Sequence, residues 1–187
     1  MTVQGDPVEL TVADADAMEA LGRRMAGSLR AGDLLVLTGP LGAGKTTFTR
    51  GLGEGLQVRG QVASPTFVLA RTHPTASGTP LVHVDAYRLS GEAELDDLDL
   101  DFEGSIVVVE WGAGLLDGVA ESWLDIVIER PTGAAEAPAV DVSDDGSAGH
   151  GPDDEQEAPA PEVLDEPRRV TITPHGTRWA DTALLAD

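Results

Sequence analysis

The sequence predicts an α/β fold of the P-loop NTPase type, a single compact domain with a central mixed or mostly parallel sheet and flanking helices. Three observations lead to this prediction. Apolar, strand-like runs alternate with stretches of helical periodicity. One of these runs continues directly into a glycine-rich phosphate-binding pattern. A length of 187 residues is enough for one hydrophobic core, so we expect residues 1–187 to form one domain.

The amino-terminal part contains a predicted strand, a helix and a second strand. Residues 8–12 (VELTV) have the pattern of a short strand. Apolar residues then recur at helical spacing at positions 18, 21, 25 and 29, and Asp14 or Asp16 could cap this helix. The apolar run in residues 33–40 (DLLVLTGP) is too short for an independent helix and is closed by Gly-Pro. Such a run is typical of a buried parallel strand.

The elements after this strand are also predicted from periodicity. Phe48, Leu52 and Leu56 recur every four residues, so we expect a helix that begins near Lys45, although three glycines weaken it. Further strands are expected at residues 81–85, 105–111, 123–130 and 168–174. The first two of these strands each end in a carboxylate, and the acidic stretch between them could hold a short helix.

Residues 132–167 interrupt the alternation of strands and helices. Their 36 positions hold eleven acidic residues, seven Ala, five Pro and four Gly, and no Lys, Arg or aromatic residue. Such a composition cannot offset the entropy of ordering, so we predict a disordered acidic insertion. Predicted strands flank the insertion, so its ends could meet in a hairpin, and we expect a short turn to replace it without loss of activity. A regulatory or docking role through charge is the alternative.

The overall composition argues against several classes of function. The net charge is -21, and -10 remains without the acidic insertion, so direct binding to a nucleic-acid backbone is disfavoured. The absence of cysteine and the scattering of the four histidines argue against a zinc site. No apolar run approaches the length of a membrane span, and the amino terminus lacks the pattern of a secretion signal. We therefore expect a soluble, cytoplasmic protein.

Residues 39–46 (GPLGAGKT) fit the phosphate-binding pattern GxxxxGK[ST]. Its glycines let backbone N–H groups surround phosphate oxygens, and the positive end of the following helix faces the same anion. Lys45, the only lysine of the chain, is expected to reach the β- and γ-phosphates, and the Thr46 hydroxyl to bind Mg²⁺. The alternative is a simple glycine-rich turn. It is disfavoured because a buried strand precedes the loop and an amphipathic helix follows it.

Hydrolysis of a bound nucleotide also requires a carboxylate for the metal ion and a group that orients water. Asp85 and Glu110 are the candidates, because each follows an apolar strand whose carboxyl end should lie at the edge of the sheet where the loop lies. Each could instead be an exposed strand-end acid or a helix cap. The sequence does not divide the roles between them.

Several residues near these motifs have two interpretations. Ser64 and Thr66 lie where small GTPases place a threonine that senses the γ-phosphate, but Ser-Pro-Thr is also ordinary turn chemistry. His83 alternates with two valines and is interpreted as a packed strand residue rather than a ligand. Arg88 could pair with phosphate or with the acidic stretch after it. Trp111 could be a core residue or a lid beside the nucleotide.

Four blocks, GPLGAGKTT, SPTF, HVDAYR and VVVEWG, occur in this order and together resemble the TsaE (YjeE) family, in which all four are signatures. The resemblance covers residues 8–130 and resumes at 168, and the departure at 132–167 interrupts none of the blocks. It implies a P-loop fold, weak ATPase activity with ATP and Mg²⁺, and association with the TsaB and TsaD proteins. Those partners complete threonylcarbamoyl transfer to an adenosine of ANN-decoding tRNAs, so tRNA would be reached only through them.

The resemblance also implies roles for individual residues. The implied nucleotide-binding residues are Gly39, Gly42, Ala43, Gly44, Lys45, Thr46 and Thr47, with Ser64, Thr66 and Trp111 beside them. The implied Mg²⁺ ligands are Thr46 and Glu110, and the implied catalytic residues are Lys45, Asp85 and Glu110. Two alternatives remain. A small P-loop kinase would usually carry an Arg-rich lid, which is not visible here, and a nucleotide-gated switch with little turnover overlaps with the family's expected activity.

Overall fold

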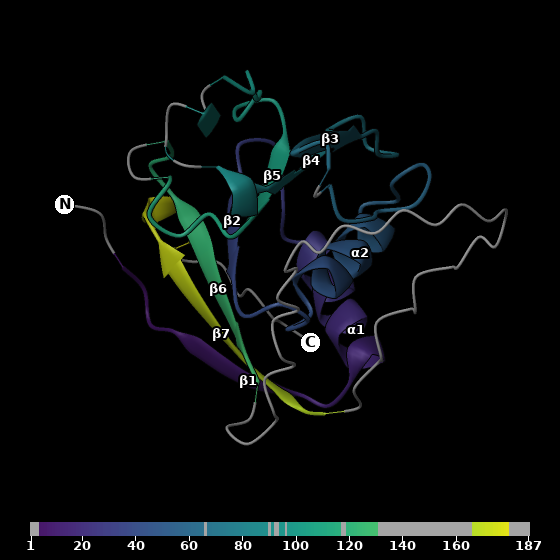
Figure 1. Ribbon diagram of the computed structural model, residues 1–187, viewed down its shortest axis with the longest axis vertical. Coiled ribbons are helices and arrows are strands. Elements are labelled where there is room, and N and C mark those ends of the chain that lie inside the picture. The colour runs from purple at the N-terminus through teal and green to yellow at the C-terminus, as the bar shows by residue number, and fades with distance from the viewer. Residues whose placement is uncertain are drawn as a thin grey trace, which may run out of the picture.

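A seven-stranded mixed sheet organises the described part of the chain, with the strand order β1-β7-β6-β2-β5-β4-β3 (Figure 1). The computed structural model describes residues 4–65, 67–89, 91, 94–95, 97–116, 119–130 and 166–179. Its elements are β1 (Val8–Val12), α1 (Ala15–Ala26), β2 (Leu34–Thr38), α2 (Lys45–Gly55), β3 (Ala70–His73), β4 (Leu81–Asp85), the 3₁₀ helix η1 (Ala86–Arg88), β5 (Ile106–Glu110), β6 (Trp123–Glu129), β7 (Arg168–His175) and the 3₁₀ helix η2 (Thr177–Trp179). The predicted α/β fold class is confirmed.

Strand β2 lies at the centre of the sheet and is parallel to both of its neighbours. It pairs with β5 on one side and with β6 on the other, and β4 extends the parallel part beyond β5. Antiparallel strands complete the sheet, with β3 next to β4, β7 next to β6 and β1 at the far edge. The register pairs Glu110 with Leu37 on one side and with Asp85 on the other. The carboxyl ends of β2, β4 and β5 therefore meet at one edge.

The two faces of the sheet are covered differently. Both α-helices lie on one side of the sheet in Figure 1, and this side buries alternate strand residues such as Leu35, Leu37 and Val108. The intervening residues, such as Leu34 and Val36, belong to a second apolar cluster on the other face. Strand residues alternate between faces, so the last residues of β4 and β5 lie on the helix side. Neither α-helix of the described ranges is long and apolar enough to cross a membrane.

Helices α1 and α2 approach each other through glycine. A Cβ atom at Gly22 of α1 would collide with the backbone carbonyl of Phe48 in α2, and a Cβ atom at Gly51 of α2 would collide with that of Glu19 in α1. The glycines that weaken the predicted second helix therefore have a packing reason. Gly22 and Gly51 let the two helix backbones lie closer than any side chain would allow.

Most predicted elements occur at the expected residues. Asp14 is the cap of α1, because its carboxylate accepts a hydrogen bond of 2.8 Å from the backbone N–H of Ala17, and α2 begins at Lys45. Strand β3 has no counterpart in the prediction. Its sequence, Ala-Arg-Thr-His, contains no apolar run, and the strand is held at the sheet edge by backbone pairing with β4.

The predicted acidic insertion at 132–167 lies outside the described residues, apart from Glu166 and Pro167. The strands that flank it, β6 and β7, are antiparallel neighbours. The expectation that the two ends of the insertion lie close together is therefore confirmed. The disorder of the segment stays a prediction. The possible short helix between the predicted strands 81–85 and 105–111 also falls partly on undescribed residues.

We expect Gly51→Ala to lower the free energy of unfolding by a net amount of about 1–2 kcal/mol. The collision with the Glu19 carbonyl forces the helices apart, and this cost exceeds the gain of about 1 kcal/mol in helix propensity. Denaturant titration measures the effect. Gly27→Ala is the matched control, because its Cβ atom would meet only the Arg24 carbonyl, at 3.7 Å. Equal stability of the two variants would contradict the close helix contact.

Candidate functional site

Residues 39–44 form a tight loop between the end of β2 and Lys45, the first residue of α2. Gly42 and Gly44 have φ angles of 71° and 112°, which glycine adopts without the strain that a side chain would bring. A Cβ atom at Gly39 would collide with the carbonyl of Ile128 on β6. The loop therefore requires glycine at these places for two reasons, backbone conformation and close approach of a neighbouring strand.

The loop leads directly into α2, whose amino-terminal cap is Gly44. Glycine offers no side chain to accept a hydrogen bond from the first backbone N–H groups of this helix. Thr46 and Thr47 occupy the first turn and are half-buried, and Ala43 is buried beneath the loop. The backbone N–H groups at this helix start are suited to an anion, which would also be favoured by the helix dipole.

Lys45 folds back over the loop from the first residue of α2. Its Nζ donates hydrogen bonds to the carbonyl oxygens of Gly39 and Pro40, at 2.7 and 3.1 Å. The same ammonium group lies 3.6 Å from the centre of the Trp111 ring. Burial lowers the pKa of Lys45 below its ordinary value, and two nearby carboxylates at the ends of β4 and β5 oppose this shift. The single lysine of the chain is thus held at the loop.

The carboxylate at the end of β5 faces the first turn of α2. The Thr46 hydroxyl donates a hydrogen bond of 2.9 Å to Oε1 of Glu110, and Nε2 of His83 lies 2.8 Å from the same oxygen. Glu110 and His83 are both buried. His83 is a packed strand residue, as interpreted from the sequence, but it also contacts a candidate site residue. The signal for this contact was its position on β4, two residues before Asp85 and hence on the same face of the sheet.

Asp85 ends β4 directly beside Glu110 in the sheet register. Its side chain is buried, and Oδ1 accepts a hydrogen bond of 3.0 Å from the backbone N–H of Tyr87. Asp85 therefore caps the short helix η1, which is one of the two alternatives that the sequence left open. The structure places two carboxylates at adjacent strand ends beside Lys45. Their catalytic roles stay predictions.

Trp111 follows Glu110 with a φ angle of 64°, a left-handed value that is uncommon for a residue with a side chain. Its backbone N–H donates to the carbonyl of Leu37 at the end of β2, at 2.9 Å. The half-buried ring packs against Tyr87, with centroids 5.3 Å apart. Of the two interpretations, the structure favours a place beside the loop over a place in the core.

The remaining predicted residues are Ser64, Thr66 and Arg88. Ser64 is exposed in the segment that leads to β3, and Thr66 lies outside the described residues. The Arg88 guanidinium lies 5.4 Å from the centre of the exposed Phe67 ring. The expected phosphate-sensing role of Ser64 and Thr66 therefore stays a prediction.

Arg130 is a site residue that the sequence interpretation missed. It follows β6, and its Nη2 donates a hydrogen bond of 3.0 Å to the carbonyl of Gly42 in the loop. Its Nε is buried and has no hydrogen-bond partner among the described residues. The contact joins residues 88 positions apart, and only the placement of β6 beside β2 brings them together.

The oxygen donors of the site suit a magnesium ion that also binds phosphate. Among the described residues no group of three His, Asp or Glu side chains could hold a metal ion by itself. Thr46 and Glu110 instead offer a hydroxyl and a carboxylate side by side. Mg²⁺ usually takes only one or two protein ligands of this kind, and water and substrate phosphates supply the rest.

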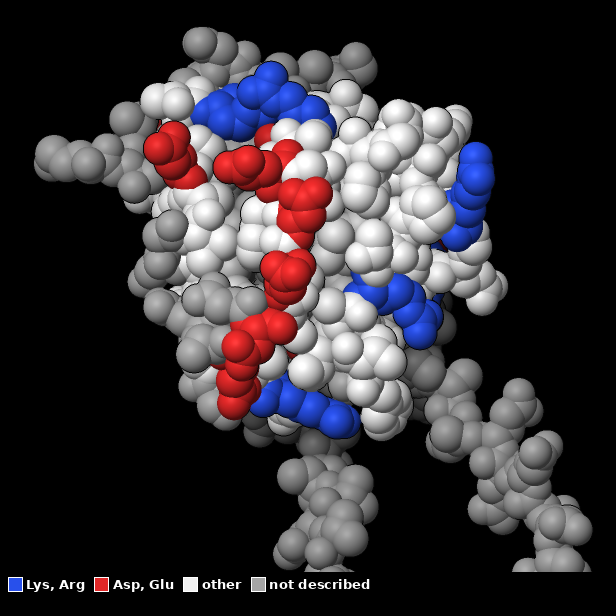
Figure 2. All heavy atoms as spheres, turned by 90° about the horizontal axis from the view of Figure 1, so that it is seen from above, with Lys and Arg blue, Asp and Glu red and all other residues white. Residues whose placement is uncertain are grey.

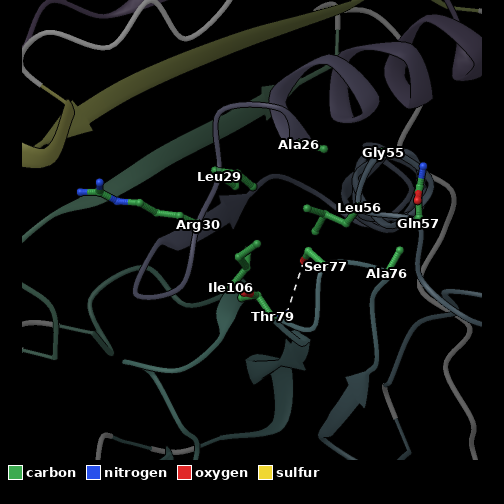
Figure 3. A pocket seen from close by; sticks show the side chains of 10 residues that line it. All are labelled: Ala26, Leu29, Arg30, Gly55, Leu56, Gln57, Ala76, Ser77, Thr79 and Ile106. Carbon is green, nitrogen blue, oxygen red and sulfur yellow. Dashed lines mark hydrogen bonds between the residues drawn. The ribbon is translucent and has the colours of Figure 1, made fainter.

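A separate pocket of about 370 Å³ lies at the opposite edge of the sheet (Figure 3). It is lined by the carboxyl ends of both α-helices, the turn before β4 and the first residue of β5, with Arg30 pointing away from the hollow. Its lining residues are Ala26, Leu29, Arg30, Gly55, Leu56, Gln57, Ala76, Ser77, Thr79 and Ile106. Ile106 begins β5 whereas Glu110 ends it, so this pocket is remote from the loop.

Comparison with known proteins assigns the family. The model of the family described as "Threonylcarbamoyl adenosine biosynthesis protein TsaE" matches residues 12–136. The chain belongs to the TsaE family. The resemblance inferred from the four sequence blocks is therefore confirmed, and TsaE membership agrees with the P-loop geometry at residues 39–46.

Individual relatives support the assignment to TsaE. A Streptomyces coelicolor protein named tRNA threonylcarbamoyladenosine biosynthesis protein TsaE is 49% identical over 175 residues, which cover 90% of this chain and 99% of that protein. A Mycobacterium tuberculosis protein of the same name is 50% identical over 120 residues, 59% of this chain and 71% of that protein. The crystal structure of Bacillus subtilis YdiB matches with a TM-score of 0.58 and 28% identity, covering 92% of this chain and 86% of that one.

We expect Arg130→Ala to weaken ADP binding to this TsaE chain by about two- to tenfold, the value of one hydrogen bond that orders the loop. The variant removes the bond to the Gly42 carbonyl. Isothermal titration with ADP measures the change. Arg169→Ala is the control, because Arg169 is exposed and its ion-pair partner, Glu129 at 2.9 Å, lies on β6 rather than in the loop. An equal affinity of the Arg130 variant and this control would show that the contact does not order the loop.

Proposed function

We propose that this TsaE chain is a Mg²⁺-dependent ATPase of the cytoplasm, required for the threonylcarbamoyladenosine modification of ANN-decoding tRNAs. It acts on a complex of TsaB and TsaD proteins. The observation that carries the proposal is the hydrogen bond of 2.9 Å between Thr46 and Glu110. It joins the start of the phosphate loop's helix to a buried carboxylate at a parallel strand end, an arrangement that suits a magnesium nucleotide in P-loop proteins.

Each part of the site has a role in this proposal. The loop N–H groups and the first turn of α2 bind the phosphates of ATP, and Lys45 exchanges the loop carbonyls for β- and γ-phosphate oxygens. Thr46 and Glu110 would hold Mg²⁺, which when bound would supply positive charge to the phosphate oxygens. Asp85 holds the attacking water, because its strand end adjoins that of Glu110. Trp111 packs over Lys45 and shields it from solvent.

Exposed apolar residues in the loop, before β3 and after β4 support a protein partner at this end of the sheet. Leu41, Phe67, Val68 and Tyr87 are 86%, 87%, 54% and 68% exposed. Leu41 belongs to the loop, and the Tyr87 ring contacts Trp111. Large apolar side chains in such a grouping are typical of a surface that another protein covers. They also support the second candidate, a nucleotide-gated switch, since a partner here would touch the loop itself.

The distribution of charge supports an indirect contact with tRNA. In Figure 2 the acidic side chains form a band down the face seen there, and the basic side chains lie singly around it. A phosphate backbone would be repelled by this band, because nucleic-acid affinity depends on clustered Lys and Arg. The TsaB–TsaD partners would then hold the tRNA.

Replacing Lys45 tests the proposed nucleotide site. We expect Lys45→Ala to abolish MgATP binding or turnover while the far-UV circular dichroism spectrum stays unchanged, because the ammonium group serves the phosphates. Isothermal titration with MgATP and phosphate release are the measurements, with Arg169→Ala as the surface-charge control. Affinity and turnover equal to those of the parent protein would remove the proposed function.

Replacing the two carboxylates tests the proposed hydrolysis. We expect Glu110→Gln and Asp85→Asn each to lower phosphate release at least about tenfold, in the presence of TsaB and TsaD, with a smaller effect on nucleotide binding. Both changes keep the side-chain size, and Asn keeps an oxygen that can cap η1. A variant that hydrolyses ATP at the parent rate would identify its carboxylate as a structural acid. The nucleotide-gated switch would be favoured by two results together. The affinity for the partners would differ between ADP and a non-hydrolysable ATP analogue, and the Glu110→Gln and Asp85→Asn variants would still support tRNA modification.

A further inference from the structure

His83 occupies the middle of β4, in the interior of the sheet. Its backbone pairs with Val108 of β5 and Arg71 of β3, and its side chain is fully buried. The imidazole lies on the face that carries α2, and its Nε2 reaches Oε1 of Glu110 at 2.8 Å. A polar side chain this deep in a sheet costs free energy unless it is hydrogen-bonded, so the contact with Glu110 is the reason it can be there.

The chemistry of the two groups gives this hydrogen bond its direction. An ionised Glu110 carboxylate can only accept, so Nε2 of His83 carries the proton and donates it. The other ring nitrogen, Nδ1, is buried and has no hydrogen-bond partner among the described residues. A proton on Nδ1 would leave a buried donor unsatisfied, which disfavours that tautomer.

Two donors therefore converge on one carboxylate oxygen. The Thr46 hydroxyl, at 2.9 Å, and Nε2 of His83, at 2.8 Å, both bond to Oε1 of Glu110. The second oxygen, Oε2, accepts no hydrogen bond from the residues that the structure describes. A free glutamate side chain samples many rotamers, and a bond on each side of Oε1 restricts it to one. The carboxylate is fixed against α2 with one oxygen left for a further ligand.

We propose that His83 is a positioning residue of the Mg²⁺ site, which holds the Glu110 carboxylate against Thr46 so that the metal ion meets preformed oxygen ligands. The inference rests on the proposed function, since it assigns the residue that orients a metal ligand of that same site. His83 itself touches neither the loop nor the phosphates in this role. Its replacement should change metal affinity without changing metal-free nucleotide affinity.

Two variants of similar size separate the hydrogen bond from packing. His83→Gln keeps an N–H donor near the position of Nε2, whereas His83→Met fills the space without a donor. His73→Met is the matched control, because His73 is also a buried histidine, on the adjacent strand β3, and its Nε2 has no partner among the described residues. The measurement is the affinity for Mn²⁺, followed by electron paramagnetic resonance at saturating ADP, together with ADP affinity in the absence of metal.

We expect His83→Met to weaken Mn²⁺ binding by about 10- to 100-fold, the loss typical of a removed outer-shell hydrogen bond, and His83→Gln to restore most of it. Metal-free ADP affinity should stay within about twofold of the parent value, since His83 does not contact the loop. Mn²⁺ affinity of His83→Met equal to that of His73→Met, or an equal loss in the Gln and Met variants, would overturn the positioning role. A parent protein that binds no ADP would instead overturn the proposed function, and this inference with it.

Discussion

The parallel pairing of β4, β5 and β2 brings three strand ends to one edge of the sheet, and the contacts of the site start from those ends. β2 continues into the phosphate loop, β5 ends in Glu110 and β4 ends in Asp85. A register shift of one residue would turn each side chain to the other face of the sheet. The carboxylate of Glu110 would then face away from Thr46. These central strands are apolar on both faces, so their register depends on how closely their side chains fit into the two apolar clusters. The packing of the core therefore also sets the geometry of the site.

The contact between α1 and α2 helps to position the first turn of α2, which is the helical part of the site. Gly22 and Gly51 let the two helix backbones touch, so α2 is held against α1 as well as against the sheet. The first turn of α2 carries Lys45 and Thr46, and their positions relative to β5 depend on this close packing. Glycine within a helix lowers its intrinsic stability, and tertiary contact offsets the loss.

The charges of the site compensate one another in a buried place. Lys45, Asp85 and Glu110 are each at most 5% exposed, and an isolated charge at such depth would be strongly disfavoured. The ammonium group has the loop carbonyls, the Trp111 ring and the field of two carboxylates, and Glu110 has the donors of Thr46 and His83. Lys45 and Glu110 are thus each surrounded by groups that stabilise their charge.

The sequence by itself determined the features that depend on short stretches of chain. The phosphate loop, the start of α2 near Lys45 and the strands 8–12 and 81–85 follow from local patterns, and four blocks in order were enough for the family. The sequence left the cap of α1 open between Asp14 and Asp16, and the structure decided for Asp14. The tertiary structure alone decided which distant side chains meet. His83 and Glu110 lie 27 residues apart, Thr46 and Glu110 64, and Arg130 and Gly42 88. These contacts depend on strand order and register. Both are set by the packing of the whole core, so they cannot be predicted from the residues of any one segment.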